Sequence, residues 1–305
     1  SSPTILIENQ SALQTIAGAA DDSTAILVKT NNLTLSGQSQ INSSTLEDTL
    51  GNGGPVTIQG LASQANSVTI DGLGSGIVTE TDGEGAGGSV NIWANQVLLR
   101  NGATISASSF GLGDTGDIHI NAGNQFTMTN SSVTTEASQA GGGAIKITTA
   151  PSGTVQLTNS TISASVLDGT GGGGSVDIDP QYVILQNSQI LAQAVNGPGG
   201  NITITITNGG LFLPDAYSVI SASSQFGVNG TVTIQSPNAP ISGQIQPLGA
   251  TPLLATSLLN QHCAALADGQ FSSFTVGARD SLPTEPGGWL ASPLATLSVG
   301  TGLGV

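Results

Sequence analysis

Apolar and polar residues alternate in a short motif, Gly-x-Val/Ile-x-Ile, that recurs along this chain. In a β-strand successive side chains point to opposite faces, so the two aliphatic residues of each motif lie on one side of a strand. The steps between motifs are 34, 28, 27, 31, 26 and 30 residues, a mean period of about 29. Such a period is typical of repeat proteins, in which each unit buries its apolar side by stacking on its neighbours. The motifs begin at Gly54, Gly88, Gly116, Gly143, Gly174, Gly200 and Gly230.

Each middle repeat contains two more segments with the same alternation. In the repeat that begins at Gly88 they are residues 97–99 and 104–107. In a later repeat, Leu211 and Leu213 are the expected inward-facing pair of the second segment. Three strands per repeat predict a coil with three sides.

The spacing favours a parallel β-helix over a β-sandwich. Sandwich hairpins pair sequential strands through short turns and need no register that repeats every 29 residues. In stacked coils each strand pairs with its counterpart one repeat later, about 4.8 Å along the axis, so a constant register is needed. The sequence therefore predicts an all-β fold, a right-handed parallel β-helix with three strands per coil over residues 25–236. Residues 1–24 are expected to be an amino-terminal strand or cap segment, and residues 237–305 a carboxy-terminal cap helix and extended tail.

An asparagine returns between the second and third strands of four repeats, in steps of 29, 29 and 28 residues. Asn tolerates left-handed backbone angles and hydrogen-bonds neighbouring main chain, so it suits a sharp corner, and stacked copies can bond along the axis. We expect a ladder of four rungs. At the third corner the turns vary in length and collect Gly and acidic residues, and we expect glycine to supply positive φ there. The ladder residues are Asn101, Asn130, Asn159 and Asn187.

The two ends of the chain break the pattern. Residues 4–8 are a strand candidate, while Ser11 to Asp22 is expected to be weakly helical or loop-like and fits no repeat. Several prolines end the repeats after residue 236, and residues 251–269 then predict a helix. Its apolar stripe needs a partner, for which the open end of the β-helix is the natural one. The stripe consists of Leu254, Leu258, Leu259, Cys263 and Leu266.

Charge and composition narrow the range of possible functions. The 305 residues include 19 acidic and 4 basic ones, a net charge of −15, so almost nothing can neutralise phosphates and we expect no nucleic-acid partner. No run approaches the roughly 20 apolar residues of a membrane helix, so we expect no transmembrane segment. Residues 1–20 lack the regions of a signal peptide, which suggests a soluble chain that is mature or cut from a longer one. The single cysteine, Cys263, is either a buried small hydrophobe or an intermolecular disulfide.

The sequence offers little for catalysis. Glycoside hydrolysis needs two carboxylates in one cleft, and lyases need acidic clusters that bind calcium beside a basic residue. Asp21 and Asp22 are adjacent but precede the repeats, and no outer face is expected to gather a cluster from equivalent positions. We therefore predict no enzyme activity, no catalytic residue and no cofactor. The outward-facing His119 is interpreted as part of a solvated column in which Lys146 and Asp177 form an exposed ion pair.

Two acidic turns are candidates for calcium, because carboxylate and carbonyl oxygens are the ligands that calcium prefers. The candidates are Asp82 and Glu84 in one turn and Asp114 and Asp117 in the next. They do not match the Gly-Gly-x-Gly-x-Asp repeat of calcium-binding rolls, whose period is about nine residues.

The repeats and the carboxy-terminal residues resemble a known family. The Gly-x-Val/Ile-x-Ile periodicity, the Asn-Ser and Asn-Gly corners and the Ile-Ser-Ala-Ser strand ends are similar to the repeat region of filamentous-haemagglutinin-like large exoproteins of bacterial two-partner secretion. Segments 257–266, 271–276 and 279–283 are similar to the carboxy-terminal end of many such proteins, so the resemblance covers roughly residues 25–290. It implies secretion through an outer-membrane partner and a role as an adhesin or surface fibre. The family's amino-terminal secretion domain is not evident in this chain.

Together these features predict an extracellular or cell-surface protein with a structural or adhesive role. A β-helix has an open strand edge at each end, and a head-to-tail contact that does not close generates a filament. We expect self-association, with a host or neighbouring-cell glycan or protein as a further partner. The alternative is a carbohydrate-binding or carbohydrate-active β-helix. The residues expected to contribute to self-assembly are Ile5, Leu6, Ile7, Leu254, Leu258, Leu259, Trp289, Leu294, Leu297 and Val299.

Overall fold

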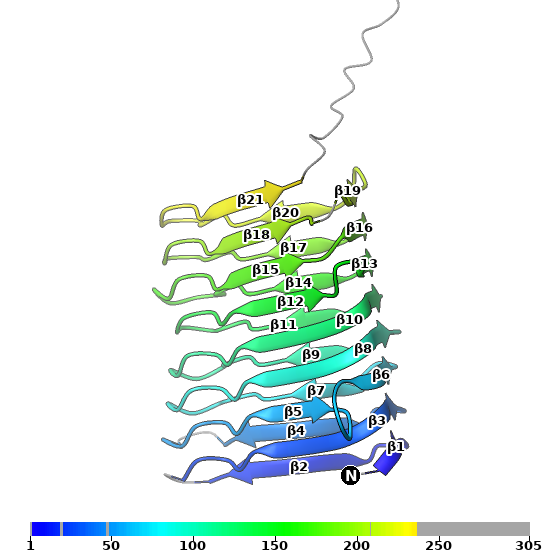
Figure 1. The fold of residues 1–305 in the computed structure, drawn as a ribbon. Coiled ribbons are helices and arrows are strands. Elements are labelled where there is room, and N and C mark those ends of the chain that lie inside the picture. Colours follow the sequence, from blue (N-terminus) through cyan, green and yellow to red (C-terminus); the bar gives the residue numbers. More distant parts are fainter. Residues whose placement is uncertain (1, 19–20, 47–48, 208, 237–305) are drawn as a thin grey trace, which may run out of the picture. The chain divides into compact units, whose positions relative to one another are not determined.

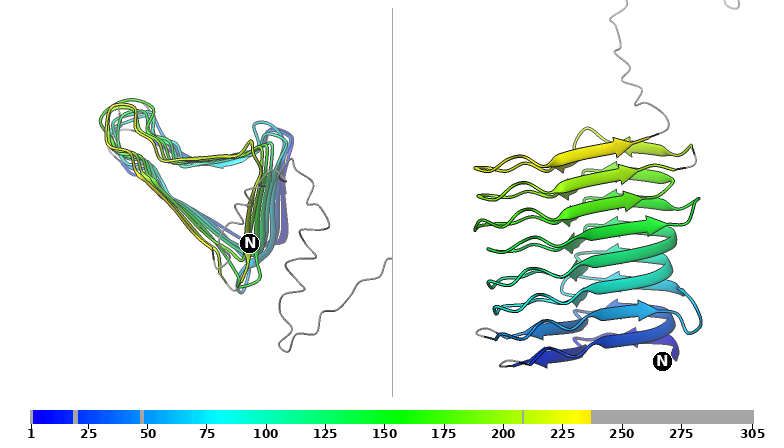
Figure 2. Two further views of the ribbon diagram at one scale, coloured as in Figure 1. Left: turned by 90° about the horizontal axis from the view of Figure 1, so that it is seen from above. Right: turned by 60° about the vertical axis from the view of Figure 1, so that its left-hand side comes forward.

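The computed structural model describes residues 2–18, 21–46, 49–207 and 209–236, and every regular element in these ranges is a β-strand. The 21 strands follow one another around a coil that rises from the amino-terminal end (Figure 1). The near strands in Figure 1 run from left to right as the coil rises, so the coil is right-handed. Seen along its axis in Figure 2, the coil is three-sided with a lobe at one corner. The predicted all-β parallel β-helix is confirmed for these residues.

The first face of the coil carries the recurring motif. Three long strands bend at a corner and cover both the first and the second face: β3 (Ile26–Ser36), β8 (Val90–Arg100) and β10 (Ile118–Thr129). The other strands of the first face are β5 (Val56–Gln59), β12 (Ile145–Thr149), β15 (Ser175–Asp179), β18 (Asn201–Thr205) and β21 (Thr231–Gln235).

The second and third faces are built from shorter strands. Those of the second face are β1 (Ser2–Ile7), β6 (Ala65–Asp71), β13 (Thr154–Thr158), β16 (Tyr182–Gln186) and β19 (Leu211–Pro214). Those of the third face are β2 (Ala12–Ala17), β4 (Gln40–Thr45), β7 (Gly76–Val78), β9 (Thr104–Ser106), β11 (Ser132–Thr134), β14 (Thr161–Ser163), β17 (Gln189–Leu191) and β20 (Val219–Ser221). The long bent strands join the first two faces into one 13-stranded sheet, and the third face is an 8-stranded sheet.

The core consists of aliphatic columns that run along the axis. Each inward residue lies beside its counterpart one coil away, as Val90 lies beside Ile118 and Ile118 beside Ile145, and all three are fully buried. The outward residue between two inward ones stays partly or fully exposed, as the alternation predicts. Complete burial of a Val, Leu or Ile side chain contributes about 1.5–3 kcal/mol. Stability therefore comes from contacts between neighbouring coils, as in other repeat proteins.

The glycine that opens each motif is required by close contact between coils, not by positive φ. A Cβ added at Gly116 would lie 1.9 Å from the carbonyl oxygen of Gly88, and one at Gly174 would lie 1.9 Å from that of Gly143. The motif glycines are absent from the residues with positive φ, among which Gly169 is the one from the third-corner turns. The expectation that glycine serves these turns through positive φ is therefore wrong for the motif positions. Any side chain there would push two coils apart.

The asparagine corner is confirmed. The four ladder asparagines all have positive φ, between 47° and 58°. The main-chain N–H of Asn101 donates to the carbonyl of Thr129 at 3.0 Å, and the side-chain amide of Asn187 donates to Oδ1 of Asn159 at 2.9 Å. The left-handed corner extends further than the four predicted rungs, because Asn9, Gly37 and Gly72 occupy the equivalent position in earlier coils with φ of 59°, 63° and 99°.

A buried serine ladder lies directly beside the asparagines and was not anticipated from the sequence. The hydroxyl of Ser160 donates to the carbonyl of Thr158 at 2.8 Å and accepts the main-chain N–H of Ser131 at 3.2 Å. Ser188 repeats both bonds one coil later. Each hydroxyl thus accepts a main-chain N–H of the neighbouring coil and donates to a carbonyl that also accepts a main-chain N–H from the coil before it.

The amino-terminal segment differs from expectation. Residues 12–17 form the strand β2, although the segment from Ser11 to Asp22 was expected to be weakly helical or loop-like. β1 pairs in parallel with β3, and β2 with β4, so the stack begins at Ser2 and residues 1–24 are not a segment separate from the coils. The sequence signal was weak because the inward positions of β2 include the polar Thr15 and its outward positions include the apolar Ile16.

In β19, the second strand of the last complete coil, the side chains point to the opposite faces from those predicted. Phe212 pairs with the inward Val183, so Leu211 and Leu213 face outward and are 41% and 49% exposed. Three consecutive apolar residues leave the alternation ambiguous by one position, and the register with β16 decides it. The predicted helix at 251–269, its stripe and the tail residues Trp289, Leu294, Leu297 and Val299 lie outside the described residues.

Candidate functional surfaces

The amino-terminal end of the stack exposes strand edges and part of the core. Among the described residues, no strand pairs with the outer edge of β1 or β2. Ile5 and Ile7 face inward and are partly buried against the core, and no described residue covers them at the end of the stack. Leu13 also faces inward, beside the fully buried Ile41, but its side chain is 44% exposed. Leu6 points outward instead, so the structure separates it from the other two self-assembly candidates of this strand.

The carboxy-terminal end has the same character. In the described part of the chain β19, β20 and β21 each have one strand neighbour. Val232 and Ile234 face inward and are 43% and 40% exposed, whereas their partners one coil earlier, Ile202 and Ile204, are fully buried. Phe212, on the β19 strand of the second face, is only partly buried. The side chains are exposed because the next layer of the column is missing from the described residues.

The two ends belong to the same columns. The column that begins with Ile26 ends with Val232, and the column that begins with Ile5 ends with Phe212. A second copy placed end to end would therefore set aliphatic and aromatic side chains on one another and continue the parallel register. Such a contact is heterologous and does not close on itself.

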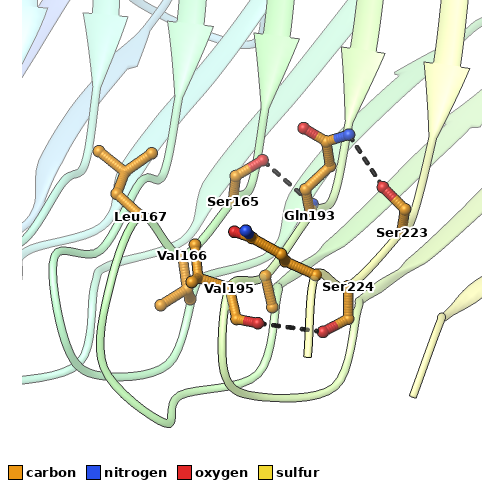
Figure 3. Close-up of a pocket in the computed structure, with 9 residues that line it drawn as sticks. Ser165, Val166, Leu167, Gln193, Val195, Ser223 and Ser224 are labelled. Carbon is orange, nitrogen blue, oxygen red and sulfur yellow. Dashed lines mark hydrogen bonds between the residues drawn. The ribbon is translucent and has the colours of Figure 1, made fainter. Parts of the chain in front are cut away.

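A pocket of about 280 Å³, lined by both polar and apolar residues, lies beside the third-corner lobe and spans three coils (Figure 3). Gln193 crosses it: its main-chain N–H donates to Oγ of Ser165 at 3.1 Å, and its side-chain amide donates to Oγ of Ser223 at 3.1 Å. Ser224 donates to the carbonyl of Gly197 at 2.6 Å. The lining contains no carboxylate and no cationic group, so it suits hydrogen bonding to a neutral polar ligand and not acid–base chemistry.

Two glutamates share one outward column on the third face, a cluster that sequence reasoning missed. Glu80, Ser108 and Glu136 occupy the same position in three successive coils, as the neighbouring bridges from Thr81 to Ser109 and from Ser109 to Ala137 show. Burial, with a smaller effect of the Asp82 charge, raises the pKa of Glu80 above its ordinary value of 4.5. Two coil spacings put the backbones of the two glutamates ~9.6 Å apart.

The four calcium candidates do not come together. Asp114 accepts the main-chain N–H of Gly141 at 2.9 Å, and Asp117 accepts that of Ala144 at 2.8 Å, so both carboxylates hold the following coil. Asp82 and Glu84 are exposed in the preceding turn. In the ranges that the structure describes, no group of three or more His, Cys, Asp and Glu side chains is placed to hold a metal ion.

The expected ion pair between Lys146 and Asp177 is not formed, although the two residues are partners in the register. The ion pair found among the described residues joins Arg100 to Asp71, with 2.9 Å between Nη2 and Oδ2. His119 lies beside Lys146 on an exposed outward column, as predicted. The sequence feature that indicates the ion pair of Arg100 and Asp71 is their separation by one repeat period.

Asp215 ends the asparagine ladder. Its Oδ2 accepts the main-chain N–H of Asn187 at 2.8 Å, and its Oδ1 accepts the hydroxyl of Ser218 at 2.6 Å. The hydrogen bond from Ser218, with further ones from main-chain N–H groups, holds the pKa of Asp215 below its ordinary value of 3.8. A carboxylate thus caps the corner where the ladder stops.

Comparisons with known proteins gave no match: neither a protein-family model, nor a curated protein, nor a solved structure is significantly similar to this chain. Within the described ranges no helix has the length and apolar character needed to cross a membrane.

Proposed function

We propose that this chain is an extracellular structural and adhesive protein, a β-helical rod that associates head to tail into a surface filament. One observation carries the proposal: at each end of the stack, apolar columns of the core stop at positions that are exposed or only partly buried. Ile5 and Leu13 mark one end, and Val232 and Ile234 the other. Exposed strand edges of this kind are templates for pairing with another chain.

The remaining surface is consistent with this role. Few residues are charged, Ser, Thr and Asn are abundant, and the net charge is −15; this composition suits a protein that faces the medium. The resemblance of the repeats and of segment 257–266 to filamentous-haemagglutinin-like exoproteins supports secretion through an outer-membrane partner and a surface location. A non-catalytic role is part of the proposal.

The test compares inward and outward substitutions on the same terminal strand. Ile5→Asp places a charge in the column that a second copy would cover, while Leu6→Asp places the same charge on the outward side of β1, where Leu6 is 56% exposed. Negative-stain microscopy over a concentration series should show rods that lengthen for the wild type and for Leu6→Asp but stay short for Ile5→Asp. Circular dichroism confirms that all three chains are folded.

Equal rod lengths for Ile5→Asp and Leu6→Asp would contradict the end-to-end contact. Single particles of wild-type protein at every concentration would contradict self-assembly itself.

A second candidate function, carbohydrate binding, rests on the pocket around Gln193. Hydroxyl and amide groups of Ser165, Gln193 and Ser223 could exchange their mutual hydrogen bonds for those of a neutral sugar. A glycan array probed with wild type and with Gln193→Leu tests it: binding that Gln193→Leu abolishes would favour this function over pure self-assembly.

A further inference from the structure

One coil carries extra residues at the corner between the first and the second face. In β8 the first inward residues of these two faces are seven positions apart, from Val90 to Val97. In the coil before it they are twelve positions apart, from Val56 in β5 to Val68 in β6. The five additional residues, 60–64, form a loop between β5 and β6 on the outside of the coil (Figure 1), which we call the insert loop.

The insert loop leaves the sheet opposite one residue, Trp93. Before it, Ile92 pairs with Ile58, and after it, Ala94 pairs with Ala65. The coil would therefore keep its register with β8 if the loop were removed. Because the stacking of the coils does not depend on these residues, their role lies on the outer surface, where insertions in repeat proteins often form the binding face.

The insert loop and three outward side chains line a pocket of about 440 Å³. This volume falls within the roughly 300–1,000 Å³ of small-molecule sites. Lys29, Gln59 and Trp93 come from three successive coils, since Lys29 pairs with Gln59 and the residue before Gln59 pairs with the residue before Trp93. The insert loop supplies the rest of the lining.

Two hydrogen bonds hold the insert loop against neighbouring coils. The main-chain N–H of Leu61 donates to Oδ1 of Asn31 at 3.4 Å, in the coil before the loop. The side-chain amide of Gln64 donates to Oδ1 of Asn121 at 2.6 Å, two coils after the loop, and so crosses the coil of Trp93. The pocket is thus formed before a ligand arrives, which lowers the entropy cost of binding.

Three side chains of the pocket have binding capacity that the protein leaves unused. In the part of the chain that the structure describes, the side chains of Lys29, Gln59 and Trp93 form no hydrogen bond or ion pair, and Trp93 is 39% exposed. They offer an ammonium group, an amide that both donates and accepts, and an aromatic face. An extended peptide has no strand edge to join here, because β5 already pairs with β3 on one side and β8 on the other.

These three groups fit a sugar acid. The C–H bonds on one face of a pyranose ring carry partial positive charge and pack on the negative face of an indole. Ring hydroxyls donate and accept hydrogen bonds, as the amide of Gln59 does, and a carboxylate at the ring edge accepts a charge-assisted hydrogen bond from Lys29. We propose that this pocket binds a uronic-acid residue of an anionic polysaccharide, with its ring on Trp93 and its carboxylate at Lys29. The site goes beyond the self-assembling rod and gives its adhesive role a ligand class.

The net charge of −15 is compatible with an anionic ligand at this place. The residues that line the pocket include no carboxylate. In the outward column of Trp93, the next carboxylate is that of Asp179, three coils or ~14 Å away. This distance exceeds the Debye length of about 8 Å at physiological ionic strength, so the charge of Lys29 dominates in the pocket.

A paired glycan array probed with the full chain tests the ligand class. Each uronic-acid oligosaccharide is printed beside its methyl ester, which keeps the ring and removes the charge. The wild type should bind at least one acid about tenfold or more tightly than its ester, the effect of one charged hydrogen bond. Lys29→Gln should bring acid and ester within about twofold of each other, whereas Lys146→Gln, which removes an exposed charge from the same face outside the pocket, should keep the wild-type ratio. Equal ratios for the two lysine variants, or no acid bound by the wild type, would overturn the proposal.

Two changes to the walls of the pocket test its geometry. Deletion of residues 60–64 gives this coil the spacing of β8, so the chain should fold with the circular dichroism spectrum of the wild type and bind the acid about tenfold more weakly or worse. Trp93→Ala should weaken acid and ester by the same factor, because the contact with the ring is common to both. Wild-type affinity in either folded variant would overturn the proposal.

The same array separates this site from the functions proposed above. Ile5→Asp and Gln193→Leu should both bind the acid like the wild type, because neither residue lines this pocket. Loss of binding in Gln193→Leu with none in Lys29→Gln would place the ligand in the other pocket and overturn this proposal. Binding of the acid by a protein that forms no filaments leaves this site intact and refutes the head-to-tail rod; filaments of a protein that binds no acid do the reverse.

Discussion

Replacing Gly174 with alanine is expected to destabilise the stack, whereas the same change at Gly172, two residues earlier in the same turn, is expected to be nearly neutral. A Cβ at Gly174 would lie 1.9 Å from the carbonyl oxygen of Gly143, which is main chain of the neighbouring coil. A Cβ at Gly172 would meet Cγ of Pro198 at 3.3 Å, the edge of a side chain. Neither glycine has positive φ, so backbone strain does not separate the two variants.

The magnitude follows from the shift that Gly174→Ala requires. Ordinary contact begins near 3.4 Å, so the two coils must separate locally by about 1.5 Å, out of a spacing of about 4.8 Å. Overpacking costs about 1–3 kcal/mol, and a displacement of that size also stretches the hydrogen bond from Gly142 N to Gly172 O, which joins the two coils beside this contact and is now 3.0 Å, beyond its useful range. One or two buried groups left unpaired add about 1–3 kcal/mol each. We expect a total loss of about 3–5 kcal/mol, against under about 1 kcal/mol for Gly172→Ala.

Guanidinium denaturation followed by circular dichroism measures the difference. The midpoint for Gly174→Ala should fall well below that of wild type at an unchanged slope, and the midpoint for Gly172→Ala should stay close to it. Equal midpoints for the two variants would refute the explanation that close contact between coils, and not chain flexibility, selects glycine at the start of each motif.

Two further predictions concern the corner and the buried carboxyl. Asn159→Ala should lose about 1–2 kcal/mol of stability, because alanine is strained at the φ of 48° and cannot accept a hydrogen bond from the amide of Asn187. Asn159→Gly should lose less, since glycine adopts this φ freely. A denaturation series in which the alanine variant is more stable than the glycine variant would contradict this. Glu80 has a raised pKa in the folded state, so its contribution is fully present below pH 4.5 and is lost as pH rises through the folded pKa. Glu80→Gln should therefore melt higher than wild type at pH 7 and at about the same temperature at pH 4, and a difference independent of pH would count against burial as the cause.

The architecture could be read from the sequence because a solenoid repeats its register. Val90 and Ile92 recur with the same spacing in every coil, and the period alone implies parallel pairing with the next copy. The positive φ at Asn130 was likewise predictable, since few residues other than Gly and Asn adopt that conformation.

Other features depend on contacts between coils that the sequence pattern of one repeat does not reveal. Leu211 and Leu213 were assigned to the wrong side because the apolar neighbour Phe212 hides the alternation. The column of Glu80 and Glu136 is hard to see in the sequence because the two glutamates lie two coils apart, with the uncharged Ser108 at the equivalent position between them.

The amino-terminal strand β2 and the function of the motif glycines were missed for a related reason. β2 belongs to the first described coil, where the inward Leu13, Thr15 and Ala17 alternate with a side that carries the apolar Ile16, so its pattern of apolar and polar residues is blurred. The glycines show no local signal at all, since what excludes a side chain at Gly174 is a carbonyl group 31 residues earlier, at Gly143.

Diffraction from oriented filaments of the full chain tests end-to-end stacking most directly. In a head-to-tail filament the strands lie across the filament axis, so the spacing of about 4.8 Å between coils repeats along that axis and gives a meridional reflection. Rods that associate side by side would place the same reflection on the equator. We predict the meridional reflection; an equatorial one, or a protein that forms no filaments at any concentration, would contradict the account.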